Sequence, residues 1–359
     1  MTSRSFATSV TEAQAGADRP PRFARGARAS APVRADLAGG TLDIWPLYCF
    51  MGGGVTVNAA VTLRAEATVR PLEARRGRVC LRVRSLDLDR EETVTDFGAP
   101  GAFGFAVDAA RAFEVDAAEI TLQSPVPRGS GLGASSALLI ALLGALRGLT
   151  GRKLAADDLV QLAADIEAKQ IGIPTGKQDY FAALLGGPLG IAFQLGRPIA
   201  TRIATPPAWL DDALALVFTG EPHDSAVTNW AMMRRYVEDE GTTRRDLRAI
   251  AATAEAVLAA LSAGAPLDEV APLVLEEWEN RKRLAPGVTT PTVEAVVSAV
   301  RGAGAVAWKI CGAGGGGALL ALAPPGRREA VLDAAAAAGA TPLRCALDRE
   351  GLKVASLEA

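Results

Sequence analysis

One stretch, PVPRGSGLGASSALLIALLGAL at positions 125–146, constrains this chain more than any other. Glycines at 129, 131 and 133 precede two serines and an apolar run that is typical of a buried helix. The first N–H groups of a helix lack backbone partners, and the helix dipole places partial positive charge there. Glycines let the main chain approach a bulky anion and adopt positive φ. The segment is therefore predicted to hold a phosphate group against its backbone; the alternative is a glycine-rich helix cap that binds nothing.

A second glycine-rich segment, KICGAGGGGALLALA at 309–323, lies between two apolar strands. Tight hairpins need one or two glycines, so the surplus predicts close packing against a ligand or against the first glycine turn, with a flexible hairpin as the alternative. Both segments match loose forms of the dinucleotide fingerprint, but the first reaches its helix through a Pro-Val-Pro-Arg detour and the second opens no helix. Neither has the GxxxxGK[ST] spacing of a standard P-loop.

Composition excludes several classes of protein. Among the 359 residues, 38 basic and 40 acidic side chains give a net charge of −2, which argues against a dedicated nucleic-acid binder or a polybasic membrane anchor. The longest apolar run, 137–146, is too short to span a bilayer. Four scattered cysteines without a CxxC pair fit a reducing cytoplasm, with neither disulfides nor a structural zinc. The single histidine, His223, is expected on the surface and rules out multi-histidine metal sites.

The order of the elements predicts an α+β fold with two layers. Residues 1–27 have no periodic apolar face and are expected to form a disordered tail without a secretory signal. Alternating β-branched residues predict that 52–74 and 78–88 are paired strands. Further strands are expected at 29–38, 118–124, 214–220, 305–312, 318–325 and 342–348, and helices at 108–115, 134–149, 155–170 and 327–339. A boundary near 200–210 predicts domains of 28–205 and 206–359.

Three segments together resemble the motifs of one enzyme family. PRGSGLGASSAL at 127–138 resembles the second motif, Pro-x-x-x-Gly-Leu-Gly-Ser-Ser-Ala, of the GHMP small-molecule kinases. KICGAGGGGALL resembles their third motif, and APVRADLAGGTLD at 31–43 resembles a diverged first motif. Within that superfamily, GIPTGKQDYFAALLGG at 172–187 and the lead into the third motif are similar to bacterial heptose-phosphate kinases. The segment 39–43 reads Gly-Gly-Thr-Leu-Asp, where galactokinases have Gly-Glu-His-x-Asp and the heptose kinases Gly-Gly-Thr-Asp.

The resemblance implies a fold and an activity. The expected architecture is a ribosomal S5 domain 2-like N-terminal domain followed by a ferredoxin-like C-terminal domain, with the site in the cleft between them. The expected reaction is ATP- and Mg²⁺-dependent phosphoryl transfer to a hydroxyl of a sugar or sugar phosphate, by a monomer or homodimer. Two alternatives stay open: a kinase of a non-sugar alcohol of isoprenoid or inositol type, and a ligand-binding regulator of the same fold without catalysis.

The resemblance also implies roles for particular residues. Asp179 matches the group that faces the acceptor hydroxyl, as proton acceptor or orienter, and Arg34 would pair with it and with a phosphate oxygen. Ser135 and Glu167 match the magnesium ligands, while Ala134 occupies the place of the first serine of the usual pair. Without the family, Asp179 reads as a turn residue, Glu167 as an exposed helix carboxylate and Arg34 as an ion-paired strand residue.

The remaining expected contacts divide between acceptor and nucleotide. Asp43, Lys177 and Gln178 are expected to contact the acceptor, although Asp43 could cap a turn and Lys177 could be solvated. The residues expected around the nucleotide are Pro127, Gly129, Ser130, Gly131, Leu132, Gly133, Ala134, Ser135 and Ser136 in the first turn, and Gly312, Ala313, Gly314 and Gly315 in the second.

Overall fold

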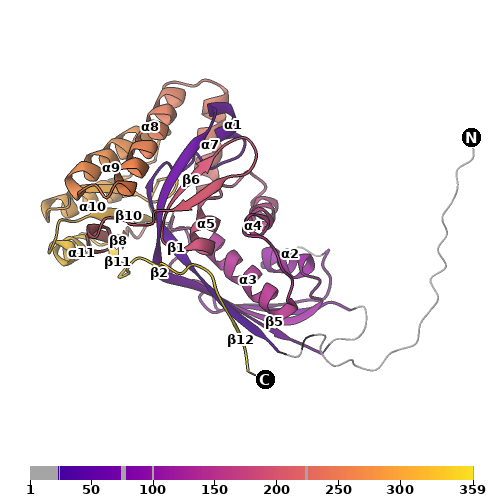
Figure 1. Ribbon diagram of the computed structural model, residues 1–359. Helices are drawn as coiled ribbons and strands as arrows, with labels where there is room; N and C mark the ends of the chain where they lie inside the picture. Colours follow the sequence, from indigo (N-terminus) through magenta and orange to yellow (C-terminus); the bar gives the residue numbers. More distant parts are fainter. Residues whose placement is uncertain (1–22, 24, 74–77, 99–100, 223–224, 359) are drawn as a thin grey trace, which may run out of the picture.

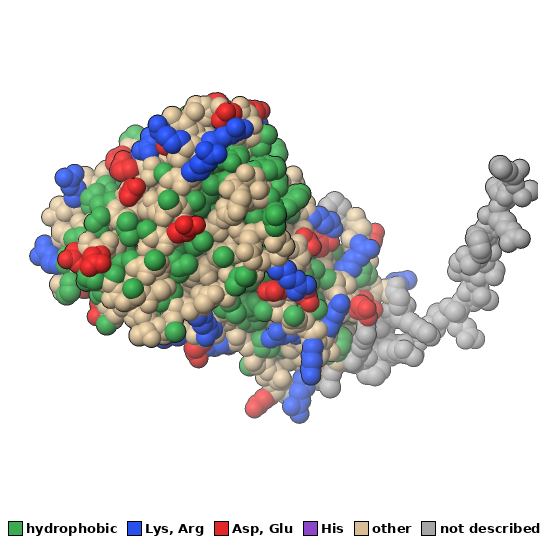
Figure 2. Space-filling model, turned by 45° about the horizontal axis from the view of Figure 1, so that its top comes forward, with side chains coloured by type: hydrophobic (Ala, Val, Ile, Leu, Met, Phe, Trp, Pro, Cys, Tyr) green, Lys and Arg blue, Asp and Glu red, His purple; other side chains and the backbone are tan. Residues whose placement is uncertain are grey.

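The computed structural model describes residues 23, 25–73, 78–98, 101–222 and 225–358 (Figure 1). Most of the predicted tail at 1–27, and His223, therefore lie outside the described residues. Within them the chain forms two β-sheets with helices packed against them, which confirms the predicted α+β class. Figure 2 shows basic and acidic side chains interspersed over the face that it presents, in keeping with the net charge of −2.

The larger sheet contains eight strands within the described part of the chain. Its path runs β12-β1-β2-β5-β3-β4, and β6 and β7 continue from β2 as a side branch. The strands are β1 (Ala27–Ala38), β2 (Gly54–Pro71), β3 (Cys80–Ser85), β4 (Arg90–Val94), β5 (Ala117–Gln123), β6 (Pro188–Phe193), β7 (Ile199–Arg202) and β12 (Lys353–Ser356). The prediction that 52–74 pairs with 78–88 is wrong, because β5 lies between β2 and β3. The chain makes β4 and a helix before β5 returns parallel to β3, a crossover that strand periodicity does not reveal.

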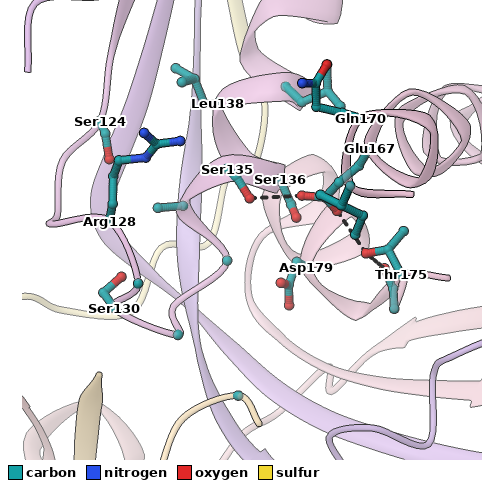
Figure 3. A pocket seen from close by; sticks show the side chains of 18 of the residues that line it. Ser124, Arg128, Ser130, Ser135, Ser136, Leu138, Glu167, Gln170, Thr175 and Asp179 are labelled. Atoms are coloured by element: carbon teal, nitrogen blue, oxygen red, sulfur yellow. Dashed lines mark hydrogen bonds between the residues drawn. The ribbon is translucent and has the colours of Figure 1, made fainter. Parts of the chain in front are cut away.

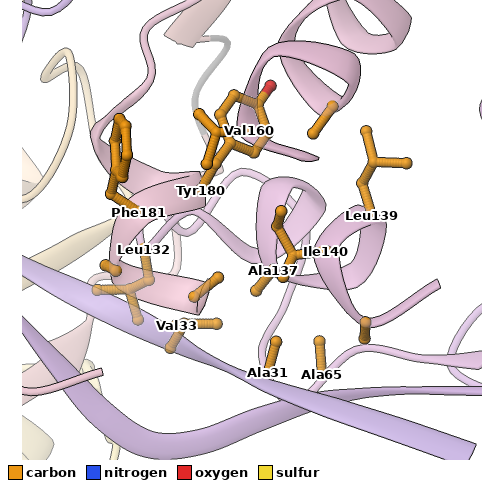
Figure 4. Close-up of a cluster of buried hydrophobic side chains, with 14 of the residues drawn as sticks. Ala31, Val33, Ala65, Leu132, Ala137, Leu139, Ile140, Val160, Tyr180 and Phe181 are labelled. Atoms are coloured by element: carbon orange, nitrogen blue, oxygen red, sulfur yellow. The ribbon is translucent and has the colours of Figure 1, made fainter. Parts of the chain in front are cut away.

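Four helices lie against one face of this sheet (Figure 1). They are α2 (Gly104–Ala112), α3 (Ala134–Thr150), α4 (Ala156–Ile171) and α5 (Gln178–Leu185). The central one, α3, packs directly on β1 and β2, where Ala31 and Ala65 face Ala137 and Ile140 (Figure 4). Small strand residues let the helix approach closely, so the helix N-terminus is fixed at the edge of the core.

The smaller sheet has the order β11-β8-β10-β9 and is antiparallel throughout. Its strands are β8 (Leu214–Phe218), β9 (Ala307–Ile310), β10 (Ala318–Leu322) and β11 (Thr341–Pro342). The helices of this half are α7 (Ser225–Val237), α8 (Thr243–Ser262), α9 (Leu267–Lys282), α10 (Pro291–Gly302) and α11 (Arg328–Ala337), and two short helices lie elsewhere, α1 (Leu47–Met51) and α6 (Trp209–Ala213). No described helix combines the length and apolarity that crossing a membrane requires.

The strand expected at 342–348 is wrong beyond its first residue, since β11 ends at Pro342. After that point the chain crosses from the small sheet to the large one. The Thr62 N–H donates to the Ala346 carbonyl at 2.9 Å, and the Asp348 N–H donates to the Ala60 carbonyl at 2.8 Å. Leu347 is therefore buried by a crossing between sheets, and Leu343 and Cys345 are half-buried, without a ladder within one sheet.

The C-terminal segment then joins the first sheet, because β12 pairs antiparallel with β1 from Ala27↔Ser356 to Ser30↔Lys353. The domain limits of 28–205 and 206–359 stay a prediction.

The segment after β1 packs in the opposite direction, onto the half that contains the small sheet. Leu42, Ile44 and Leu47 belong to the second hydrophobic core, the one built mainly from α7–α11 and the small sheet. Each half therefore lends a segment to the other.

Candidate active site

The first glycine turn has the backbone that its sequence predicts. Gly129, Gly131 and Gly133 have φ of 72°, 71° and 71°, values that L-residues rarely adopt. Gly133 is the N-cap of α3, and no side chain caps the helix. The turn therefore leaves the N-terminal end of α3 available to an anion.

The third-motif loop packs on this turn. A Cβ at Gly312 would lie 3.2 Å from the Gly131 carbonyl oxygen, and the Ala318 N–H donates to the Ser130 carbonyl at 2.7 Å. Farther along the loop, the Gly315 N–H donates to the Val288 carbonyl at 2.7 Å. The glycine surplus therefore allows backbone to approach backbone, so that the second loop braces the first.

Arg34 and Asp179 form an ion pair beside the turn. Arg34 comes from β1 and Asp179 from the first turn of α5, and Arg34 Nη2 lies 2.6 Å from Asp179 Oδ1. The other terminal nitrogen of Arg34 donates to the Gly131 carbonyl at 2.6 Å, where a phosphate oxygen was the expected partner. One guanidinium thus fixes both the carboxylate and the turn.

The pKa of Asp179 is higher than that of an ordinary aspartate. Burial raises its pKa to about 6, partly offset by Arg34, which lowers it, while Asp43 and Glu167 raise it further. A carboxyl group with a pKa near neutrality is a stronger proton acceptor than an ordinary aspartate, and it is still ionised above pH 6.

Ser135 and Glu167 meet at the other side of α3. Ser135 Oγ donates to Glu167 Oε1 at 2.9 Å, and Thr175 Oγ1 donates to Glu167 Oε2 at 2.9 Å (Figure 3). The buried hydroxyl of Tyr180 also donates to Glu167 Oε2. Hydroxyl and carboxylate oxygens side by side fit Mg²⁺, which takes one or two protein ligands and completes its shell with phosphate and water.

These groups line one cavity of about 810 Å³. Its apolar lining includes Leu88, Phe103, Phe105 and Leu122, with the polar Ser85 and Asp87 beside them in the chain. Ser124 and Arg128 lie on the opposite side of the start of α3 from Glu167 and Thr175 (Figure 3). The expected site residues that line the cavity are Arg34, Asp43, Gly129, Ser130, Gly131, Gly133, Ala134, Ser135, Ser136, Glu167, Gln178, Asp179, Gly312 and Ala313. Pro127, Leu132, Lys177, Gly314 and Gly315 do not line it.

The end of the cavity beside Asp179 is polar. Asp43 Oδ2 accepts a hydrogen bond from the Gln178 N–H at 3.0 Å, and burial raises the pKa of Asp43. The side-chain Oε1 of Gln178 is buried and has no hydrogen-bond partner among the described residues. Lys177, two residues from Asp179, turns away instead, since its Nζ donates to Gln161 Oε1 at 2.7 Å.

Four residues of the site escaped the sequence reasoning. Thr175 and Tyr180 flank the Gly-Lys-Gln-Asp segment, and the hydroxyl of each donates to Glu167. Thr41 and Asn229 line the polar end, one from each half of the molecule. The hydroxyl of Thr41 was readable as part of the first motif, whereas nothing in the sequence of α7 singles out Asn229.

Comparison with known proteins defines the class of this fold and site. The model of the GHMP kinases N terminal domain matches residues 103–187, and that of the GHMP kinases C terminal domain matches residues 253–341. The crystal structure of a D-glycero-D-manno-heptose 1-phosphate kinase from Bacteroides thetaiotaomicron superposes with a TM-score of 0.71 at 25% identity, over 93% of this chain and 100% of that one. The fold is therefore the two-domain fold of small-molecule kinases, as predicted.

Two relatives in sequence have different acceptors in their names. The mevalonate kinase of Pyrococcus horikoshii is 27% identical over 251 residues, 66% of this chain and 68% of the relative. The D-glycero-alpha-D-manno-heptose 7-phosphate kinase of Campylobacter jejuni is 30% identical over 167 residues, 45% of this chain and 48% of the relative. This chain belongs to the GHMP kinases, a family of phosphotransferases.

Proposed function

We propose that this protein transfers the γ-phosphoryl group of ATP, with Mg²⁺, to a hydroxyl of a sugar or sugar phosphate. The observation that carries the proposal is the position of Asp179. Its carboxylate abuts Gly133 at the start of α3, in the same cavity as the Ser135–Glu167 pair. Phosphoryl transfer needs a place for the phosphates, a metal site and a group that receives the hydroxyl proton, and these three lie together here.

Each group has a defined task in this scheme. The N–H groups of the glycine turn and of the first turn of α3 bind the polyphosphate. Ser135 and Glu167 would hold the metal ion, which would neutralise charge on the phosphates. The acceptor hydroxyl gives its proton to a carboxylate oxygen of Asp179, and Arg34 orients that carboxylate through its 2.6 Å ion pair. The apolar lining of the cavity suits an adenine ring.

The polar end of the cavity supports a hydroxyl-rich acceptor. Gln178 lines this end, and its Oε1 is a buried acceptor with no donor among the residues that the structure describes, so a small adjustment of the side chain would let a substrate hydroxyl supply one. Asp43 adds a second acceptor. Arg34, the cation at this end among the described lining residues, is already paired with Asp179. These features favour a sugar over mevalonate, whose carboxylate would need a cation, although the likeness to mevalonate kinases keeps an isoprenoid alcohol as the second candidate.

The proposal extends to the setting of the reaction. The partner is a small molecule and not a nucleic acid, the protein acts in the cytoplasm as a monomer or homodimer, and the cofactors are ATP and Mg²⁺. The net charge of −2 supports a small-molecule partner over a nucleic acid.

The direct test compares Asp179→Asn with the wild type and with Asp165→Asn. Asp165 is an exposed carboxylate of α4 outside the cavity, so its variant controls for the loss of one charge. ADP release and ³¹P NMR would be followed with D-galactose, D-mannose 6-phosphate, myo-inositol and R-mevalonate as acceptors. We expect Asp179→Asn to lower kcat by roughly 100-fold or more and Asp165→Asn to leave it unchanged.

Three results would contradict the proposal in different ways. Equal rates for Asp179→Asn and wild type would remove Asp179 from the reaction. Turnover of R-mevalonate alone would assign a non-sugar acceptor. Binding of ATP and sugar by the wild type without any transfer would favour a ligand-binding regulator of the same fold.

A further inference from the structure

A chain of fully buried charges connects the two halves of the molecule behind the cavity. Lys309 Nζ on β9 lies 3.3 Å from Asp36 Oδ2 on β1 and 3.0 Å from Glu277 Oε2 on α9. Glu277 Oε1 in turn lies 2.5 Å from Arg281 Nη2, one helical turn farther along α9. All four side chains have no exposed surface. Removing so many charges from water costs folding free energy, which the contacts of these side chains must offset.

The chain ends on the loop that follows β1. Arg281 Nη2 donates to the Gly40 carbonyl at 2.8 Å, and Arg281 Nη1 donates to Thr41 Oγ1 at 3.3 Å. A Cβ at Gly40 would lie 2.5 Å from Asp36 Oδ2, so only glycine lets the loop sit this close to the buried charges. The loop carries Thr41 and Asp43 to the polar end of the cavity.

The donor and acceptor roles in these hydrogen bonds determine how the side-chain amide of Asn229 is oriented. A guanidinium has only donors, so the Thr41 hydroxyl accepts from Arg281. Its single proton is then free to be donated, and the hydroxyl donates to Asn229 Oδ1 at 3.1 Å. A more distant acceptor, Met232 Sδ, lies at 3.8 Å and is weak. The Asn229 carbonyl therefore points at Thr41, which leaves the amide N–H bonds without a partner among the side chains that the structure describes, on a residue that lines the cavity.

We propose that Asn229 is a specificity-determining residue whose amide N–H donates to an oxygen of one particular hydroxyl of an uncharged polyol. Arg281 acts through Thr41 as a positioning residue that keeps the amide in this orientation. The inference rests on the proposed kinase function and narrows its acceptor to a molecule that carries no anionic group at this end of the cavity.

Complementarity supports this acceptor class. Asn229 supplies donors, while Gln178 Oε1 and Asp43 supply acceptors, and neighbouring hydroxyls of a sugar can satisfy both kinds at once. A phosphate or carboxylate placed here would instead meet the carboxylates of Asp43 and Asp179, with Arg34 already paired. Asn229 comes from α7 and Asp43 from the loop after β1, so the subsite requires both halves.

The test combines enzyme variants with deoxy sugars. Asn229→Asp keeps the shape and the oxygen that faces Thr41 but replaces the N–H donor. Asn229→Ala removes the side chain. Thr41→Val removes the hydroxyl, so the amide of Asn229 can rotate to the opposite orientation. Thr253→Val is the matched control, because Thr253 is buried on α8, bonds only the Ala249 carbonyl at 2.9 Å and does not line the cavity. KM and kcat would be measured for ATP and for D-galactose, D-mannose and L-fucose, together with monodeoxy analogues of the sugar that is turned over fastest.

We expect Asn229→Asp and Asn229→Ala to raise the KM for the sugar roughly tenfold and Thr41→Val roughly threefold, with the KM for ATP and the control unchanged. The effect of Asn229→Ala should vanish for one deoxy analogue, the one that lacks the bonded hydroxyl. A KM for the sugar that stays at the wild-type value in both Asn229 variants would overturn the inference and leave the kinase function intact. An equal rise for every analogue, or efficient turnover of D-mannose 6-phosphate but not of D-mannose, would also overturn it. If the wild type phosphorylates none of these acceptors, the proposed function fails and the inference fails with it.

Discussion

Gly133 connects the first glycine turn to α3, and a Cβ added there would meet Asp179, so replacing it with alanine tests the geometry of the site. Two effects are expected from Gly133→Ala. Its φ of 71° is strained for an L-residue, which costs roughly 1–2 kcal/mol of folding free energy. Its new Cβ would lie 2.8 Å from Asp179 Cγ, about 0.6 Å inside the 3.4 Å at which ordinary contacts begin, so the carboxylate has to retreat.

This displacement of the Asp179 carboxylate should lower the rate of phosphoryl transfer. Misplacing a catalytic group by about 1 Å can cost on the order of 100-fold, so we expect kcat to fall roughly 10- to 100-fold. Gly151, at the other end of the same helix, provides the control. It is the C-cap of α3 with φ of 70°, and a Cβ there would meet nothing within 4 Å. Gly151→Ala should therefore lose the same stability and keep its activity.

The assay is a urea unfolding curve and a steady-state rate for each variant at saturating ATP, Mg²⁺ and acceptor. The reasoning is refuted if Gly133→Ala loses stability as expected but turns over at the wild-type rate. It is equally refuted if Gly151→Ala loses as much activity as Gly133→Ala, because strain in the helix and not contact with Asp179 would then explain both.

Two further predictions concern charge. The proposed role of Asp179 requires the ionised carboxylate, and burial raises its pKa to about 6, so kcat/KM should fall as the pH drops through about 6. Arg34→Met removes the cation that lowers this pKa, so the acid limb should move to higher pH, and a limb that stays in place or moves lower would contradict the assignment. Lys309→Met leaves Asp36 and Glu277 buried beside an uncharged group and should lower the free energy of unfolding by about 3–5 kcal/mol in urea. The exposed Lys353–Glu350 pair gives the control, since Lys353→Met should change stability by less than about 1 kcal/mol. A loss below about 1 kcal/mol for Lys309→Met would mean that the buried charges are satisfied in another way.

The local parts of this structure could be predicted from the sequence. The span of α3, the positive φ of Gly129, Gly131 and Gly133 and the bracing glycine loop follow from residue types within a few positions of one another. The order of strands in the large sheet did not follow, because β5 inserts between β2 and β3 only after a crossover. The crossing at 343–348 also escaped, since an apolar run has the same sequence signal whether it pairs in one sheet or passes between two.

The contacts between distant segments were the hardest to foresee. A Glu and an Arg four residues apart, as at Glu277 and Arg281, usually form a solvated pair on a helix surface. Here both are fully buried, and Lys309 on β9 forms a second ion pair with Glu277. All three residues can be read from the sequence, but their burial depends on how α9 packs against β9, which no local pattern encodes.

The alternation of β1 explains why the catalytic pair and the buried charges cannot be varied independently. Arg34 and Asp36 are two residues apart on a strand, so their side chains leave the same face. Arg34 turns to Asp179 and the glycine turn, while Asp36 turns to Lys309 and, through Glu277, to Arg281 and Thr41. The residues of β1 from Ala31 to Ala38 are all buried, which leaves this strand little freedom to shift. A movement of β1 would therefore displace the proposed proton acceptor and the proposed acceptor-binding loop together.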